Sequence, residues 1–116
     1  MESITVDLIP LLNCNNQLPT CHASQNDSGR HVEVKLTENG EPYYLKGDED
    51  ITLAVKVSDN TEVCKRVMNS GSDSLIIVIS SDMTHSYGDQ LCELVIKDST
   101  SRVASSNFIM HVEKLP

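Results

Sequence analysis

Aromatic and basic residues are both scarce in this chain, and each shortage excludes a class of function. Among 116 residues there is no Trp, one Phe and three Tyr, so the core must be aliphatic and an aromatic-lined binding groove is not expected. Only 9 residues are Lys or Arg against 17 Asp and Glu, for a formal net charge of −8. Such a surface repels phosphate groups, which argues against nucleic acid and against an anionic membrane as partners.

Long apolar runs are lacking as well. None approaches the roughly 20 residues that a membrane span requires. Residues 1–13 have neither a basic start nor a continuous apolar centre, so they do not read as a secretory signal. We therefore expect synthesis in a cytoplasm, where structural disulfides are rare. The length suits one core, and we expect a single domain over residues 1–116.

What the chain does contain is alternation of apolar and polar residues, the pattern of half-buried β-strands. Val32, Val34 and Leu36 share one face of such a strand. The main strands are expected at 4–9, 30–37, 51–57, 62–68, 75–79, 91–97 and 106–113, with short pieces at 20–24 and 43–45. The pattern predicts an all-β, immunoglobulin-like antiparallel β-sandwich of about seven strands. Leu75–Ile79 is apolar throughout, which indicates a central strand covered on both faces.

Turn residues separate these strands. Asn39-Gly40 supplies the positive φ angles of a tight hairpin. Pro42 cannot donate to a sheet ladder, so the return strand must be an edge, which Pro42 and Glu41 would protect from pairing. Ser81–Tyr87 is the one expected helical piece, capped by Ser81 and ended by Gly88.

The best metal candidate is the group Cys14, Cys21 and His22. Structural zinc sites usually present close cysteine pairs and a second pair of ligands. Here six residues separate the two cysteines, and no second close pair exists. We expect two ordinary loop thiols rather than a metal site. A metal-stabilised protein or small metalloenzyme remains an alternative that this group alone motivates.

Cys64 and Cys92 are spaced like the bridge of an immunoglobulin domain. Such bridges pack against a Trp, which this chain lacks. Strand phase places Cys92 in the core and Cys64 beside Arg66 on an outer face. We therefore expect no bridge between them.

Two other groups are weighed as sites of chemistry. His85 lies near Asp82 and Ser86, but neighbours on one short turn do not make a triad. Gly47-Asp48-Glu49-Asp50 lacks the alternation and closing Glu of a calcium loop, so a solvated turn is expected. We expect no enzyme, and no catalytic, cofactor-binding or metal-binding residue.

A further set of motifs occurs in a fixed order. A Gln-x-Asp turn precedes an alternating strand that runs into Leu-Thr-x-Asn-Gly-x-Pro-Tyr-x-Leu, and the last strand reads Phe-x-Φ-x-Val-Glu, where Φ is apolar. The matching residues are Gln25, Asp27, Leu36, Thr37, Asn39, Gly40, Pro42, Tyr43, Leu45, Asp59, Asn60, Gly88, Cys92, Leu94, Ile96, Asp98, Phe108, Met110, Val112 and Glu113. In this order they resemble the N-terminal domain of phage upper baseplate proteins of the BppU type. Asn26 stands where that family commonly has Gly, and Gln90 where it often has Tyr.

The resemblance implies a structural role in a phage or prophage. Such a domain docks a fibre or baseplate subunit, usually trimeric, to the distal tail protein or the baseplate hub. A C-terminal region, absent from residues 1–116, would hold the receptor-binding protein that attaches to the host. The expected location is the virion tail or baseplate, assembled in the bacterial cytoplasm. The alternative is a bacterial cell-surface or secreted immunoglobulin-like binding module, which is motivated by the generic sandwich pattern with an acidic surface.

Overall fold

A computed structural model describes residues 1–9, 18–69, 71–100 and 103–116. The described chain contains nine strands and one short helix: β1 (Glu2–Asp7), β2 (Thr20–Ser24), β3 (Arg30–Glu38), β4 (Glu41–Pro42), β5 (Asp50–Lys56), β6 (Glu62–Arg66), β7 (Ser74–Ile79), α1 (Ser81–Thr84), β8 (Gly88–Lys97) and β9 (Val103–Glu113). Cys14 falls outside the described residues, so the structure does not test the prediction of a loop thiol there.

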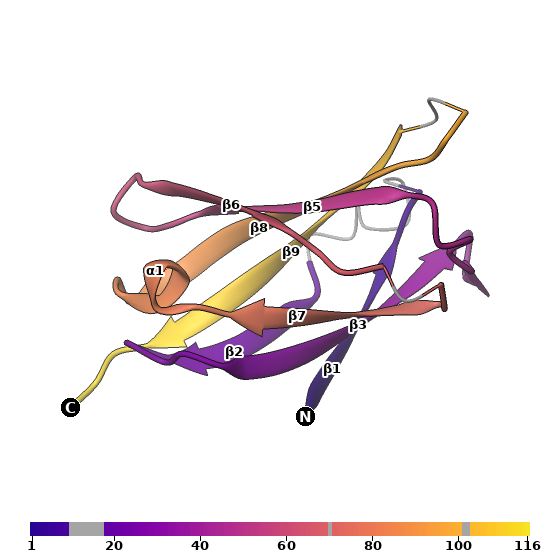
Figure 1. The fold of residues 1–116 in the computed structure, drawn as a ribbon. Helices are drawn as coiled ribbons and strands as arrows, with labels where there is room; N and C mark the ends of the chain where they lie inside the picture. Colours follow the sequence, from indigo (N-terminus) through magenta and orange to yellow (C-terminus); the bar gives the residue numbers. More distant parts are fainter. Residues whose placement is uncertain (10–17, 70, 101–102) are drawn as a thin grey trace.

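The strands form two facing sheets, which confirms the all-β sandwich (Figure 1). One sheet has five strands in the order β2-β9-β8-β5-β6. In the other, β3 lies between β1 and β7, and β4 pairs with the end of β3. In immunoglobulin nomenclature β3, β5, β7, β8 and β9 occupy the places of strands B, C, E, F and G, with β6 beside strand C.

The sheets are not purely antiparallel as predicted. β1 pairs with β3 in parallel, with Ile4 opposite Val34, and β2 pairs in parallel with β9, with Cys21 opposite Met110. Both parallel strands come from the start of the chain, which changes sheets between β1 and β2. Alternating polarity specifies which face of a strand is buried but not the direction of its neighbour, so the sequence pattern could not reveal these pairs.

The core is aliphatic, as the composition predicts. Alternate residues of both sheets face inward, and Val34, Leu53, Leu94 and the one phenylalanine, Phe108, are at most 1% exposed. The predicted inward set of the last strand, Phe108, Met110 and Val112, is confirmed.

The hairpin after β3 forms at the predicted residues. Asn39 and Gly40 have φ angles of 54° and 81°, the left-handed values that a tight hairpin turn demands. The return strand is shorter and earlier than predicted: β4 is Glu41–Pro42, and 43–45 is not a strand. Pro42 does lie at an edge, because β4 pairs with β3 alone.

The helical piece is also shorter than predicted. α1 covers Ser81–Thr84, and its N-cap is Ser80 rather than Ser81. Ser80 makes no capping bond to the backbone, because its hydroxyl donates to the Asp82 carboxylate instead. Gly88 does not end the helix. It begins β8, with a φ of 116° that suits glycine.

The prediction that Leu75–Ile79 is a central strand covered on both faces is wrong. β7 pairs with β3 alone among the described strands and forms an edge of its sheet. Leu75, Ile77 and Ile79 are buried, but Ile76 is 40% and Val78 is 52% exposed. The run is continuously apolar because both faces of β7 carry hydrophobic side chains, and those on the outer face are exposed to solvent.

Candidate functional site: the open edge of the sandwich

The structure separates the predicted metal candidates. Cys21 is buried in β2, not a loop thiol, and burial, with the nearby negative charge of Glu2, raises its pKa to about 12. His22 follows it on the strand and therefore points to the opposite face, where Glu2 binds it. Within the described residues, no group of three His, Cys, Asp or Glu side chains is arranged to hold a metal ion.

Cys64 and Cys92 lie as strand phase predicted. Cys92 is fully buried in β8, and burial raises its pKa well above the ordinary thiol range. Cys64 is exposed in β6, and β5 separates β6 from β8 in the sheet. The two thiols are therefore on different faces of non-adjacent strands, a geometry that a disulfide cannot span.

His85 takes part in an ion pair rather than a triad. Its Nδ1 lies 2.9 Å from the carbonyl oxygen of Asp82, and its Nε2 lies 2.6 Å from Oδ2 of Asp59. Both ring nitrogens thus face oxygen acceptors, and the Asp59 carboxylate raises the pKa of His85. Hydrogen bonds from the Thr61 hydroxyl and His85 lower the pKa of Asp59 to about 2. The pair ties α1 to the turn after β5 and leaves no ring nitrogen to activate a hydroxyl.

The turn at 47–50 is not simply solvated, because Glu49 is buried. Its carboxylate accepts hydrogen bonds from the backbone N–H groups of Lys46 and Gly47 and from the side-chain amide of Asn69. Burial alone would raise the pKa of Glu49, but these donors together hold it below its ordinary value. The carboxylate is therefore a structural element that fastens this loop to the segment after β6.

The two sides of the sandwich differ in how their sheet edges are joined. On one side lie β1 and β2, and the Glu2 carboxylate joins them by accepting from the His22 backbone N–H and contacting its ring, each at 2.7 Å. On the other side lie β6 and β7, the outer strands of the five-stranded and four-stranded sheets. There the sheet edges face each other without a bridging strand among the described residues (Figure 1).

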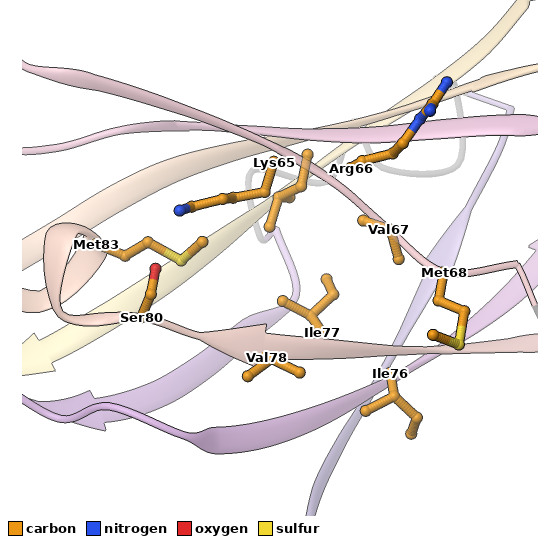
Figure 2. Close-up of a pocket in the computed structure, with 10 residues that line it drawn as sticks. Lys65, Arg66, Val67, Met68, Ile76, Ile77, Val78, Ser80 and Met83 are labelled. Carbon is orange, nitrogen blue, oxygen red and sulfur yellow. The ribbon is translucent and has the colours of Figure 1, made fainter.

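A groove of about 350 Å³ lies on this second side, which we call the open edge. It is lined by Leu53, Lys65, Arg66, Val67, Met68, Ile76, Ile77, Val78, Ser80 and Met83. Figure 2 shows Ile77 pointing between the sheets toward β6, whereas Ile76 and Val78 point the other way. Met68 at the rim is 84% exposed. Three exposed apolar side chains therefore cluster at one edge of an otherwise acidic molecule.

The main chain of β7 is open along this edge. The Leu36 N–H donates to the Asp73 carbonyl, which fixes the phase of the β3–β7 ladder. In that phase Leu75, Ile77 and Ile79 bond to β3, while Ile76 and Val78 turn their N–H and C=O groups away from it. No described strand pairs with β7 on that side. The neighbouring groups of Ser74 are occupied locally, because both contact the Ser72 hydroxyl.

One basic side chain lies in the groove of this otherwise acidic molecule. Lys65 is part of the lining, which contains no carboxylate, although acidic residues outnumber basic ones by 17 to 9 in the chain. Lys65 Nζ lies 3.2 Å from Asp82, whereas Arg66 points away from the groove and lies 2.8 Å from Asp50 (Figure 2). The Lys65–Asp82 pair is solvent-exposed and therefore weak, so an incoming carboxylate can exchange with Asp82 at little cost.

Sequence reasoning did not predict this site. The available signal was the uninterrupted apolar run of Leu75–Ile79 close after the apolar Met68. A strand with both faces apolar is either central in its sheet or lies at an edge with one apolar face exposed, and periodicity does not distinguish the two.

Comparison with solved structures agrees with the fold. The chain is similar to the N-terminal domain of phage TP901-1 ORF48, a baseplate protein, with a TM-score of 0.68 and 17% sequence identity. The similarity covers 97% of this chain and 98% of that one. No protein-family model and no curated protein matches the sequence. Within the described residues, no helix has the length and hydropathy to cross a membrane. The resemblance stated from the sequence motifs is thus confirmed for the fold.

Proposed function

We propose that the chain is a structural module of a phage tail baseplate that docks a fibre or baseplate subunit to the tail without catalysing a reaction. The observation that carries the proposal is the match over nearly the whole chain to a baseplate domain, at 97% coverage. The ordered motifs that run from Gln25 to Glu113 support the same role independently.

The site geometry is consistent with docking. Of the candidate groups weighed for chemistry, Cys21 and Cys92 are buried, and His85 and Glu49 are committed to structural contacts. The exposed apolar residues instead gather at the open edge, where a protein partner would cover them.

The proposed partners are the distal tail protein or the baseplate hub of the same phage. We further propose that the full-length subunit is a homotrimer, located in the virion tail, and that it holds the receptor-binding protein through a C-terminal region. Nucleic acid and membranes are not proposed as partners, because the net charge of −8 disfavours both.

The test is reconstitution of the complex. The chain, in its native oligomeric state, is mixed with the distal tail protein encoded at the same locus and examined by sedimentation velocity. A complex of defined stoichiometry is expected. If the two proteins sediment independently at high micromolar concentrations of each, and the hub protein gives the same result, the docking role is wrong.

A further inference from the structure

The open edge corresponds to a strand position that this chain leaves unfilled. In a constant-type immunoglobulin sandwich one sheet has the order A-B-E-D, so strand D pairs with the free edge of strand E. Here β7 holds the place of strand E, and the described residues between β6 and β7 form no strand. The residues that would have made strand D, Val67 and Met68 among them, instead cross from one sheet to the other at the rim of the groove (Figure 2).

The position is able to accept a strand from another chain. Ile76 and Val78 present unused main-chain donors and acceptors toward it, as the ladder phase shows. An added strand pairing with β7 would alternate its side chains between the groove and the outer face. The inward set would meet Val67 and Met83, and the outward set would lie beside the exposed Ile76 and Val78. β7 is six residues long, which sets the length of a matching segment.

The charge at the groove indicates the chemistry of that strand. Lys65 lies in the groove, whose lining has no carboxylate, whereas Arg66 points away toward the outer face of the five-stranded sheet (Figure 2). A second copy of this chain would offer β7, an uncharged strand with the sequence SLIIVI, and would leave Lys65 without a new partner. A segment that combines apolar residues with acidic ones fits both the groove and its charge.

We propose that the open edge binds an extended acidic and apolar segment of a partner protein, which pairs with β7 as the missing fourth full strand of its sheet. The inference rests on the proposed function only for the identity of the partner, expected to be a tail protein. The strand addition itself follows from the free main chain of β7 and the groove beside it.

A direct test uses two synthetic peptides and the ¹⁵N-labelled full chain. The acidic probe is a seven-residue peptide of alternating valine and glutamate, and its counterpart replaces glutamate by lysine. The acidic probe is expected to slow amide hydrogen exchange at Ile76 and Val78, which the counterpart should leave unchanged. The same acidic peptide with N-methylated main-chain amides should lose at least about tenfold in affinity, because two or more main-chain hydrogen bonds are removed.

Two pairs of variants locate the interaction on the protein. Ile76→Pro removes an edge-facing N–H without removing a bond to β3, and should weaken the acidic probe by about tenfold or more, since strand addition depends on that donor. Ile76→Thr keeps the N–H and is the matched control. Lys65→Glu should weaken binding, whereas Lys56→Glu makes the same charge change elsewhere on the surface and should not.

Three results would overturn the proposal. The first is equal affinity of the acidic and lysine peptides, or equal affinity of the acidic peptide with and without N-methylated amides. The second is protection of Ile76 and Val78 that depends on the concentration of this chain alone, which would mean that a second copy occupies the edge. The third is a complex with the distal tail protein that Ile76→Pro leaves intact, an outcome in which the proposed function survives. If instead the acidic probe binds at Ile76 and Val78 while neither tail protein binds the chain, strand addition stands and the proposed function fails.

Discussion

Asp7 shows how a single side chain connects distant parts of this fold. At the end of β1, its carboxylate accepts hydrogen bonds from the Ile9 and Gly40 N–H groups at 2.8 and 2.9 Å and from the Thr37 hydroxyl at 2.8 Å. Asn39 donates a longer bond to the same group. The first strand is thereby fastened to the hairpin. The carboxylate also serves as the acceptor for backbone N–H groups that do not donate to a neighbouring strand.

The ionisation of Asp7 should therefore be linked to stability. Burial alone would raise its pKa, but the donors from Gly40, Ile9, Thr37 and Asn39 together hold the pKa below its ordinary value. A lowered carboxyl pKa adds stability above the unfolded-state pKa of about 4, and this stability is lost as the pH falls through the folded-state pKa. Denaturant unfolding from pH 7 to pH 2 should show this loss.

The substitution Asp7→Asn should lower the free energy of unfolding at pH 7 by about 1–3 kcal/mol, since buried donors lose a charged acceptor. The acid-dependent loss should also be smaller in Asp7→Asn than in the original chain. Asp48→Asn, in an exposed turn, removes the same charge and serves as control. Parallel stability curves for the original chain and Asp7→Asn below pH 4 would contradict the role given to Asp7.

The Asp59–His85 pair gives an independent prediction with the opposite sign of pH dependence. The pKa of His85 is raised mainly by its hydrogen bond to Asp59, so the pair stabilises the fold below about pH 6.5 and this contribution is lost as the pH rises through the folded-state pKa. An NMR titration of the His85 ring should give a midpoint above 6.5. Asp59→Asn should move that midpoint down, and an unchanged midpoint would mean that the pair does not form in solution.

At the scale of elements, the turns depend on residues that tolerate positive φ angles. Asn26 has a φ of 68°, which explains how Asn can stand where the baseplate family commonly has Gly. Asn26→Gly should therefore change the free energy of unfolding by less than about 0.5 kcal/mol, whereas Asn26→Val should lower it by about 1–2 kcal/mol. Thermal or denaturant unfolding of both variants checks this. Equal effects of Gly and Val would show that the turn does not hold this conformation.

Gln90 is the second departure from the family pattern, and it too has a local physical role. Its side chain is buried in β8, where Oε1 accepts from the Ser58 N–H at 2.5 Å and Nε2 donates to the Ser86 carbonyl at 2.8 Å. One amide thus serves a donor and an acceptor on two different loops.

Elements were predictable where their conformation depends on residues close in sequence. Alternation located β3, β5, β8 and β9 within a few residues, and Asn39-Gly40 located the hairpin, because strand pleat and turn conformation are determined by neighbouring residues. The parallel pairing of β1 and β2 and the edge position of β7 depend on which strands meet across the whole chain. Periodicity carries no information about that, so an exposed edge strand was mistaken for a buried central one.

The site was less predictable than the fold. Among the candidates named from the sequence, Cys21 and Cys92 are buried and His22 and His85 are ion-paired. The docking candidate instead consists of ordinary apolar residues such as Ile76 and Val78. Their significance comes from exposure and from the free main chain beside them. Both properties exist only once the sheets are assembled.

At the scale of the whole molecule, the reactivity of the cysteines tests whether the core is intact, and their oxidation state tests in which redox compartment the protein is made. In a Cys14→Ser background, the exposed Cys64 should react with a thiol reagent at once, whereas Cys21 and Cys92, buried on inner faces of the five-stranded sheet, should react only as the molecule unfolds. Free thiols would fit assembly in a cytoplasm, which the proposed baseplate role implies. Rapid reaction of all three thiols would contradict the described core. Bridged thiols in the protein from its native source would favour the secreted alternative.

The sandwich has one side closed by Glu2 and His22 and one side open between β6 and β7, so the molecule is asymmetric in where it can extend its sheets. Because paired, covered or charged edges resist further pairing, an uncharged, apolar and unpaired edge is the exception on this surface. If no partner covered this edge, it would be open to pairing with other chains and so to aggregation.

The measurement that tests this account most directly is amide hydrogen exchange of the chain, alone and in complex with the distal tail protein encoded at the same locus. The account predicts that complex formation slows exchange at Ile76 and Val78 and in the segment from Lys65 to Met68, while the outer face of the five-stranded sheet around Leu91 is unaffected. Protection confined to that outer face or to the β1–β2 side, with Ile76 and Val78 exchanging as in the free chain, would contradict it.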